Sequence, residues 1–597
     1  MDSAEVYDYI VCGGGTAGCV VAGRLAENSN IRILVIEAGQ HNKDLENVHM
    51  AGGWSNNFDS ETDWNIVTPS IKGVDDRQVK LSRGRFLGGS SGCNGTLCVR
   101  GSPQDYDDWG LEGWSGKEVF AAMRKVDPDL LSTSSRSRSL IMHEQAETFH
   151  PKDWHQADLK SHGTSGPLHT EPHDLAPIGN LLLDSFVSQG LPLRHDMFST
   201  GDIPHGCGHD YHRANVTILT DTTVDRVILQ QGADGLRATG AVVVFPDGSS
   251  RNFNARREVI ISGGAYCSPA VLMRSGIGAR QELKDVGIPC NVDLPGVGKN
   301  LMDHLIVFMF YETEKPGLTN DYHVYHDDNF NKTYAQWKEH KSGFLSTFPF
   351  GSFAFARLDD RLKDESLWKN APREPGRDPM GLTPKQPNVE FFSTECYGGP
   401  KQYDQFPINH KHAFSIIAEL FAPKSRGTVT LKSKNPMENP IVDCNYLADP
   451  MDLLVLSEAC RFGNEIVMQG AGTKDIVKGS WPPNLSHHTY KTREEWVPYV
   501  KQHATTCYHA SGTCAMGADD NPMAVLDNKL RVQGVAGLRV ADTSVMPVLC
   551  GGHTQMVAYG IGERCADFIK ETWNEGRKEQ RTRQGEGQGR LLTRAHL

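Results

Sequence analysis

The fold is decided by YDYIVCGGGTAGCVVAGRLAENSNIRILVIEAG, which spans residues 7–39. This stretch begins with an apolar run, passes through a glycine turn into a run of small residues, and ends in a second apolar run. Short apolar runs of this kind predict buried strands, and the small residues between them predict a helix. The segment therefore predicts a strand–helix–strand unit at the start of an α/β domain.

The glycines of this stretch have the spacing of a nucleotide-binding turn. Gly13, Gly15 and Gly18 satisfy G-x-G-x-x-G, a pattern that permits a tight turn and brings backbone N–H groups close to a pyrophosphate at a helix N-terminus. Glu37 follows about 20 residues later, where a carboxylate can accept hydrogen bonds from ribose hydroxyls. The pattern predicts a bound FAD or NAD, and its alternative is a glycine-rich turn without a ligand.

Composition narrows the class of protein. Of the 597 residues, 38% are hydrophobic and 22% are charged, and the formal net charge is −12. These values are typical of a large globular enzyme, the negative charge disfavours a nucleic-acid partner, and no apolar run is long enough to cross a membrane. The 14 cysteines are scattered without CxxC pairs, which is typical of free thiols in a reducing compartment. We therefore expect a cytoplasmic protein that acts on a small molecule.

Several blocks further along the chain resemble the signatures of one enzyme family. SRGRFLGGSSGCNG (residues 82–95) is similar to its first signature and GAYCSPAVLMRSGIG (264–278) to its second, with VGKNLMDH (297–304) shortly after. CYHASGTCAMG, GLRVADTSVMP and GGHTQMVAYGIGERCADFI follow in order towards the C-terminus. On these blocks, which are spread over nearly the whole chain, the protein is identified as a member of the glucose-methanol-choline (GMC) oxidoreductase family, of the fungal intracellular type.

The resemblance implies FAD as the cofactor, a Rossmann-like FAD-binding domain, and a substrate domain with a mostly antiparallel sheet flanked by helices. Because strand-like runs of the FAD-binding sheet recur far downstream, we expect that domain to be discontinuous. It is predicted to comprise residues 1–125, 215–310 and 525–573, and the substrate domain residues 147–214 and 311–524. Residues 126–146 are predicted to be a disordered insertion, and residues 574–597 a disordered tail.

The resemblance also implies which residues contact FAD. A helix beginning near Thr554 and Gln555 would point its first N–H groups, with that of Met556, at the flavin edge where negative charge develops. The other implied contacts are Gly13, Gly15, Thr16, Ala17 and Gly18 at the pyrophosphate, Glu37 and Ala38 at the ribose, Val224 at the adenine, Asp542 at the linking chain, and Leu87, Ser91, Asn94, Gly95, Thr96 and Leu97 at the flavin. Cys93 stands where some family members carry a histidine linked to FAD, and we expect a free buried thiol rather than a covalent bond.

His509 and His553 match the catalytic pair of the family. Oxidation of an alcohol needs a base for the hydroxyl proton while a hydride leaves the carbon, and an imidazole that titrates near neutrality can take the proton. We expect His509 to be the principal base and His553 to hydrogen-bond the substrate oxygen, although the two roles can be exchanged. The hydride would go to flavin N5, and the electrons then to oxygen or another acceptor.

Two rival functions stay open at this point. A redox-silent relative, such as a lyase or a cyclase, would keep the FAD fold and use the histidines for acid–base work alone. A degenerate chain would bind flavin poorly, because the stretch at residues 206–213 is shorter than in the family. Two histidine-rich stretches, residues 150–173 and 205–212, have neither zinc-finger nor HExxH spacing, so no metal site is predicted.

The substrate and the compartment are predicted from weaker signals. Phe391, Phe392 and Tyr397 lie in the expected substrate domain and would suit an aromatic or polyketide-like alcohol, although such residues are often core. An intracellular location favours a secondary-metabolite pathway over biomass degradation. The final tripeptide Ala-His-Leu resembles a relaxed peroxisomal signal, which makes the peroxisome the alternative to the cytoplasm.

Overall fold

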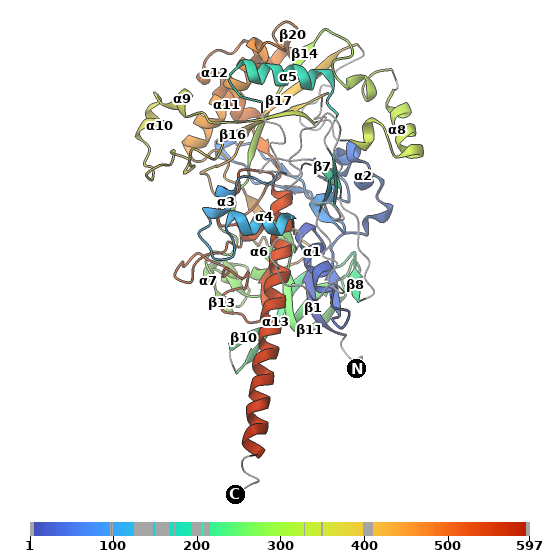
Figure 1. The fold of residues 1–597 in the computed structure, drawn as a ribbon, viewed down its shortest axis with the longest axis vertical. Helices are drawn as coiled ribbons and strands as arrows, with labels where there is room; N and C mark the ends of the chain where they lie inside the picture. Colours follow the sequence, from blue (N-terminus) through green and yellow to red (C-terminus); the bar gives the residue numbers. More distant parts are fainter. Residues whose placement is uncertain are drawn as a thin grey trace, which may run out of the picture.

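In a computed structural model, the structure is described for residues 5–95, 97, 99–124, 147–149, 168–171, 174–193, 205–207, 215–233, 235–327, 329–347, 350–397 and 410–592. The predicted insertion at residues 126–146 lies outside these residues. Of the shortened stretch at 206–213, only the strand residues up to 207 are described. Most of the strands form two main sheets, one in the lower and one in the upper half of the molecule (Figure 1).

The first sheet contains the opening strand–helix–strand unit. β1 (Val6–Cys12) pairs in parallel with β2 (Ile33–Ile36) on one side and with β11 (Ser250–Ile261) on the other. The full order is β8 (Val216–Leu219), β2, β1, β11, β10 (Gly235–Val244) and β9 (Thr223–Gly232), with β22 (Leu538–Val540) also pairing with β11. β1 and β2 are almost wholly buried, as expected of parallel strands covered on both faces. This is the predicted Rossmann-like domain, assembled from distant parts of the chain.

Two helices from opposite ends of the chain cover this sheet together. α1 (Thr16–Leu25) packs along α13 (Thr554–Leu592), and the two lie side by side beneath the upper half of the molecule (Figure 1). α13 differs from the prediction of a disordered tail, because it continues as one helix past residue 574 as far as Leu592. The reason lies in composition: Glu, Arg, Gln and Lys make up most of residues 575–584, and these residues have high helix propensity.

The second sheet is antiparallel, as predicted for the substrate domain. Its order is β15 (Phe350–Ala356), β16 (Val389–Thr394), β17 (His412–Leu420), β14 (Leu305–Thr313) and β20 (Val477–Ser480), and β21 (Thr505–Thr506) also pairs with β14. The helices α5 (Pro177–Ser188), α11 (Pro450–Gln469) and α12 (Arg493–His503) pack on it. β14 begins at Leu305, so residues 305–310 belong to this sheet and not to the FAD-binding domain to which they were assigned.

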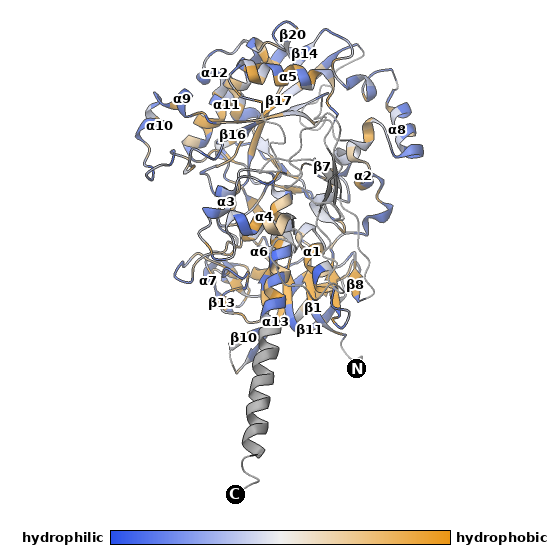
Figure 2. Ribbon diagram, viewed as in Figure 1, coloured by the Kyte–Doolittle hydropathy of each residue, from blue (hydrophilic) through white to orange (hydrophobic). Residues whose placement is uncertain are grey.

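Apolar residues gather on the strands of both sheets, and hydrophilic ones on outer elements such as α8 and α10 (Figure 2). No helix in the described part of the chain is both long and apolar enough to cross a membrane. The other helices are α2 (Glu46–His49), α3 (Pro103–Asp107), α4 (Gly116–Arg124), α6 (Gly264–Arg274), α7 (Arg280–Asp285), α8 (Asn329–His340), α9 (Asp359–Leu362) and α10 (Ser366–Asn370). The other strands are β3 (Ile66–Val67), β4 (Lys80–Leu81), β5 (Glu147–Phe149), β6 (Leu168–Glu171), β7 (His205–Cys207), β12 (Ile277–Gly278), β13 (Val292–Asp293), β18 (Thr428–Thr430) and β19 (Ile441–Asp443).

Candidate active site

One cavity of about 320 Å³ connects the two sheets. At one end it is lined by the glycine turn after β1, and at the other by both predicted catalytic histidines, His509 and His553. The predicted FAD contacts that line it are Gly13, Gly15, Thr16, Ala17, Glu37, Ala38, Ser91, Asn94, Gly95, Leu97, Val224, Asp542, Thr554 and Gln555. Gly18, Leu87 and Met556 are buried behind this lining, and Thr96 lies outside the described residues.

The glycine turn has the open side that a pyrophosphate needs. A Cβ added to Gly15 would meet only the carbonyl oxygen of Ser262, at 4.0 Å, so the space beside this residue is free. Gly13 has a φ of +116°, and a Cβ there would approach the same oxygen to 2.3 Å. α1 starts at Thr16 directly after the turn, and its N-terminal N–H groups therefore face the cavity, where a phosphate would be bound.

Glu37 is fixed at the end of β2 by the backbone around it. Its two carboxylate oxygens accept hydrogen bonds from the N–H groups of Gly14 (3.0 Å) and Gly39 (2.9 Å). Burial raises the pKa of Glu37 to about 7, against the lowering effect of these hydrogen bonds. The side chain is therefore held at the cavity wall, where its remaining lone pairs can meet ribose hydroxyls.

The opposite part of the cavity carries polar groups suited to the ribityl chain and the flavin. Asp542 accepts hydrogen bonds from the N–H of Gly264 (2.9 Å) and the hydroxyl of Ser268 (2.6 Å). Asn94 donates through Nδ2 to Oε1 of Gln555 at 2.9 Å. Because α13 begins at Thr554, its first N–H groups lie at this wall and have no partner within the helix.

His509 and His553 meet at the far end of the cavity, with their ring centroids 4.7 Å apart and each less than a tenth exposed. The backbone N–H of His509 donates to Oδ1 of Asp303 at 2.8 Å, and Oδ2 of the same carboxylate accepts from Thr506 and Tyr446. His553 lies one residue before α13. The two imidazoles, predicted as a pair, are thus held side by side by different parts of the chain.

Two buried carboxylates stand behind the histidines, and sequence reasoning missed both. Glu390 on β16 and Glu419 on β17 are paired residues in the sheet register, and neither is exposed. Nε2 of His553 is 2.9 Å from Oε2 of Glu390, and Nδ1 of His509 is 3.3 Å from Oε1 of Glu419. The signal that would have found them is a single charged residue within each apolar strand, since an unpaired buried charge is costly.

Burial and these contacts set opposite protonation tendencies for the two histidines. Burial lowers the pKa of His509 to about 3, although Glu419 acts to raise it. Burial would also lower the pKa of His553, but the charge of Glu390, its hydrogen bond and the charge of Glu419 together raise it. Burial raises the pKa of Glu390 to about 7, whereas the rings of His304 and His509 and the charge of His553 overcome burial and hold the pKa of Glu419 well below its usual range.

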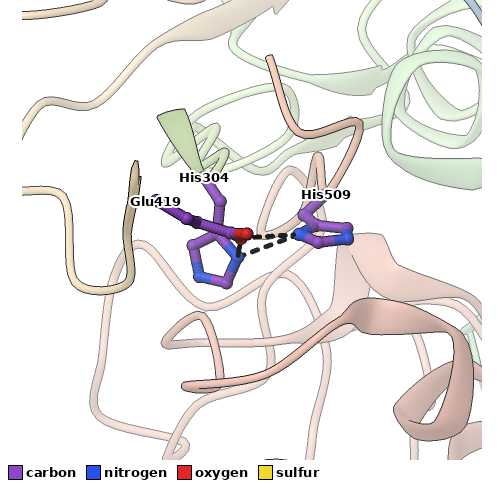
Figure 3. Close-up of side chains that lie close together, drawn as sticks. All are labelled: His304, Glu419 and His509. Atoms are coloured by element: carbon purple, nitrogen blue, oxygen red, sulfur yellow. Dashed lines mark hydrogen bonds and ion pairs between the residues drawn. The ribbon is translucent and has the colours of Figure 1, made fainter. Parts of the chain in front are cut away.

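A third imidazole, that of His304, completes the cluster. Its Nδ1 is 2.9 Å from Nδ1 of His509 and 3.0 Å from Oε1 of Glu419, so the three side chains converge (Figure 3). Its Nε2 is 3.0 Å from the carbonyl oxygen of Phe421. His304 ends the VGKNLMDH block, but the resemblance assigned it no role.

Among the residues that the structure describes, the members of this cluster are also the ones that could hold a metal ion. The sets His304–Glu419–His509 and Glu390–Glu419–His553 each bring their nitrogen and oxygen atoms within 4.8 Å of one another. We assign no ion to them, because the two closest contacts, each 2.9 Å long, are hydrogen-bond distances that a shared proton satisfies. The histidine-rich stretches lie outside the residues whose side chains are described.

The wall beside His553 is apolar and aromatic. Ile306, Phe308, Phe350, Phe392 and Thr394 line it, and the Phe392 ring is 6.0 Å from that of His553. The other two aromatic residues that suggested the substrate lie elsewhere: Phe391 packs on Phe462 and Tyr397 on Phe310, both in the core. Strand alternation separates Phe391 from Phe392, since neighbouring residues on a strand point to opposite faces.

Cys93 also lines the cavity as a free thiol, and burial raises its pKa to about 12.

A nucleotide-binding turn that opens into a cavity ending at two buried imidazoles defines the class of the protein as a dinucleotide-dependent oxidoreductase. Sequence models of the GMC oxidoreductase family match residues 7–197, 205–306 and 423–562. The chain belongs to the GMC oxidoreductase family, and FAD is its cofactor. It is an enzyme of the kind that acts on the CH–OH group of donors.

The similarity to known relatives covers nearly the whole chain. The oxygen-dependent choline dehydrogenase of Burkholderia ambifaria is 30% identical over 596 residues, covering 94% of this chain and 93% of that protein. The choline dehydrogenase of Vibrio vulnificus is 30% identical over 591 residues, with 94% of each covered. A variant of formate oxidase from Aspergillus oryzae, studied for FAD modification, has a TM-score of 0.85 at 27% identity, covering 96% of this chain and all of that one. A fungal aryl-alcohol oxidase, with a TM-score of 0.76 at 24% identity, shares the fold.

Proposed function

We propose that the protein oxidises a primary or secondary alcohol to an aldehyde or ketone, with His509 as the base and His553 as the hydrogen-bond donor to the substrate oxygen. The observation that carries this assignment is the difference between their surroundings. His509 is buried beside a second imidazole and is held neutral at neutral pH, whereas His553 shares a 2.9 Å contact with Glu390 that favours its protonated form. A base must be free of its proton, and a donor must hold one.

The protein residues would then act in a fixed order. The alcohol binds against the apolar wall with its hydroxyl between the two rings, and His553 donates a hydrogen bond to the oxygen. His509 takes the hydroxyl proton while the carbon loses its hydride. FAD, held along the glycine turn, Glu37 and the start of α13, supplies the hydride acceptor at flavin N5. The apolar residues around the rings exclude water, which strengthens these polar contacts.

The test is the reductive half-reaction without oxygen. His509→Ala is expected to keep FAD bound and to slow flavin reduction by alcohol by about 10²–10⁴-fold, the usual contribution of a general base. Full-rate reduction in this variant would refute the assignment of His509. Purified protein whose yellow flavin never bleaches with any alcohol, yet which forms product, would favour a redox-silent lyase or cyclase, and colourless protein would favour a degenerate chain.

We infer from the cavity wall that the substrate is an apolar or aromatic alcohol. Phe308, Phe350 and Phe392 offer flat apolar surface next to His553, and aromatic rings pack well against such surfaces. The relatives named for choline suggest the competing substrate, a cation that aromatic rings also bind. Anaerobic bleaching with matched series of benzyl-type alcohols and of choline analogues separates the two, and faster bleaching by choline would refute an apolar substrate.

We further propose a cytoplasmic enzyme of secondary metabolism that passes its electrons to oxygen or another acceptor. The cysteines whose side chains are described are all free, which fits a reducing compartment. Oxygen consumption measured with and without an artificial acceptor identifies the acceptor. A fluorescent fusion that leaves the C-terminal tripeptide free tests the compartment, and co-localisation with peroxisomes would refute the cytoplasmic assignment.

A further inference from the structure

Glu419 lies at the centre of the buried cluster and contacts more of its members than any catalytic residue does. Its Oε1 is 3.0 Å from Nδ1 of His304 and 3.3 Å from Nδ1 of His509, and its Oε2 is 3.7 Å from Nε2 of His553. The thiol of Cys507 is 3.4 Å from the same Oε2. Glu419 has no exposed surface and does not line the cavity, so it acts on the reaction only through these neighbours.

The contacts around Nδ1 of His509 favour a proton on that nitrogen. A carbonyl oxygen can only accept, so Nε2 of His304 donates to Phe421. The 2.9 Å contact between Nδ1 of His304 and Nδ1 of His509 needs one proton, and a proton on His509 is carried by a nitrogen that is also 3.3 Å from Oε1 of Glu419. The charge of Glu419 beside the same nitrogen favours an N–H there as well. The lone pair of His509 is therefore on Nε2, on the side of the ring away from Glu419 (Figure 3).

Glu419 also provides a charge that the reaction needs. When the alcohol O–H bond breaks and a new N–H bond forms at Nε2, His509 becomes a cation in a site where it is only 8% exposed. Burial opposes that cation, because a charge removed from water must be compensated. Oε1 of Glu419 is 3.3 Å from Nδ1 of His509, so its negative charge lies directly beside the ring that becomes a cation.

We propose that Glu419 is a positioning residue for the alcohol oxidation: it holds the ring proton of His509 on Nδ1, leaving Nε2 to act as the base, and it balances the charge of the imidazolium that forms. This inference rests on the proposed function. The titratable groups that face Glu419 are His304 before β14, Glu390 on β16, Cys507 and His509 after β21, and His553 before α13. The arrangement corresponds to the carboxylate of a serine-hydrolase triad, which orients its histidine in the same way.

Glu419→Gln tests this role, because it removes the charge and keeps the shape. The matched control is Glu312→Gln, which removes a buried carboxylate from β14 of the same sheet, where it pairs with Lys411 and not with the cluster. We expect Glu419→Gln to bind FAD, to bind alcohol with an unchanged dissociation constant, and to reduce flavin about 100-fold more slowly or worse. The control is expected to stay within about twofold of the wild type.

The pH profile of flavin reduction separates positioning from a general structural effect. Loss of the Glu419 charge lowers the pKa of His553, so the decline in rate as pH rises is expected to begin at a lower pH in Glu419→Gln. If that variant folds poorly, Glu419→Asp keeps the charge and should keep the wild-type profile at a reduced rate. Unchanged rate and profile in Glu419→Gln, or an altered profile in Glu419→Asp, would overturn the proposal.

Failure of this inference and failure of the proposed function give different results. If no alcohol bleaches the wild-type flavin, the proposed function is wrong. If the wild type bleaches and Glu419→Gln bleaches equally fast, only the role of Glu419 is wrong. A double variant with His304→Gln adds a further criterion: residues that act together on His509 should show a combined loss smaller than the product of the single losses, and fully multiplicative losses would contradict a shared action.

Discussion

Replacing Glu390 with glutamine should weaken the proposed hydrogen-bond donor of the active site without touching the cavity wall. Glu390 contacts Nε2 of His553 at 2.9 Å, and both side chains are buried. A hydrogen bond to a charged group contributes about 1.5–3 kcal/mol, and each 1.36 kcal/mol is tenfold in rate. If the whole contribution is lost in the transition state, Glu390→Gln should reduce the rate of flavin reduction roughly 10- to 150-fold.

The same substitution has a predicted effect on pH dependence. Glu390 is one of the groups that raise the pKa of His553, and the active form, in which His553 holds its proton, is lost as pH rises through that pKa. In Glu390→Gln the pKa of His553 falls, so the loss of activity should begin at a lower pH than in the wild type. Stopped-flow reduction without oxygen, measured from about pH 5 to pH 9 around the ordinary histidine range, records both effects. A variant with the wild-type profile and rate would refute the acid role of His553, provided that Glu312→Gln also behaves as wild type.

Four further substitutions test other parts of the structure. Gly13→Ala places a Cβ 2.3 Å from the carbonyl oxygen of Ser262 at a φ of +116°, so it should purify with little FAD, as measured by the ratio of flavin to protein absorbance; full occupancy would contradict the assigned turn. Phe391→Ala should lower the free energy of unfolding by about 3–5 kcal/mol in a denaturant titration. Phe392→Ala should chiefly raise KM for aromatic alcohols. Equal changes of KM in both variants would contradict the strand alternation. Acid should release FAD from Cys93→Ser as readily as from the wild type, since burial raises the pKa of this thiol to about 12 and keeps it protonated. Flavin that stays on the denatured wild-type protein in mass spectrometry would contradict this and reveal a covalent bond.

Much of the FAD-binding half could be predicted from the sequence, because its decisive features are local. The strand–helix–strand unit, the glycine turn and Glu37 all lie within residues 7–39, and periodicity and glycine spacing report such short-range structure directly. These features and the family signatures predicted the Rossmann-like fold and the FAD cofactor. Both predictions were confirmed by the similarity to the GMC oxidoreductase family. The boundary at residue 310 was wrong because it divides one continuous strand, β14, whose wholly buried residues give no alternation to mark its start.

The carboxylates and the third histidine were missed because their roles depend on register. Glu390 and Glu419 face each other only because β16 and β17 pair in one particular alignment, and a slip of one residue would turn both side chains to the opposite face. His304 reaches His509 because β14 lies between β17 and β21 in the sheet. None of these relations is encoded by spacing along the chain.

The sequence by itself determined the class of fold and the cofactor, and it singled out the two histidines as the proposed catalytic pair, because each of these depends on residues in short, recognisable segments. The tertiary structure alone decided what those histidines can do. Both rings are buried, but the two strand carboxylates compensate them unequally, so that the pKa of His509 falls to about 3 while the pKa of His553 rises above its usual value. Desolvation and charge proximity are properties of the assembled interior, and they arise only when segments hundreds of residues apart are packed together.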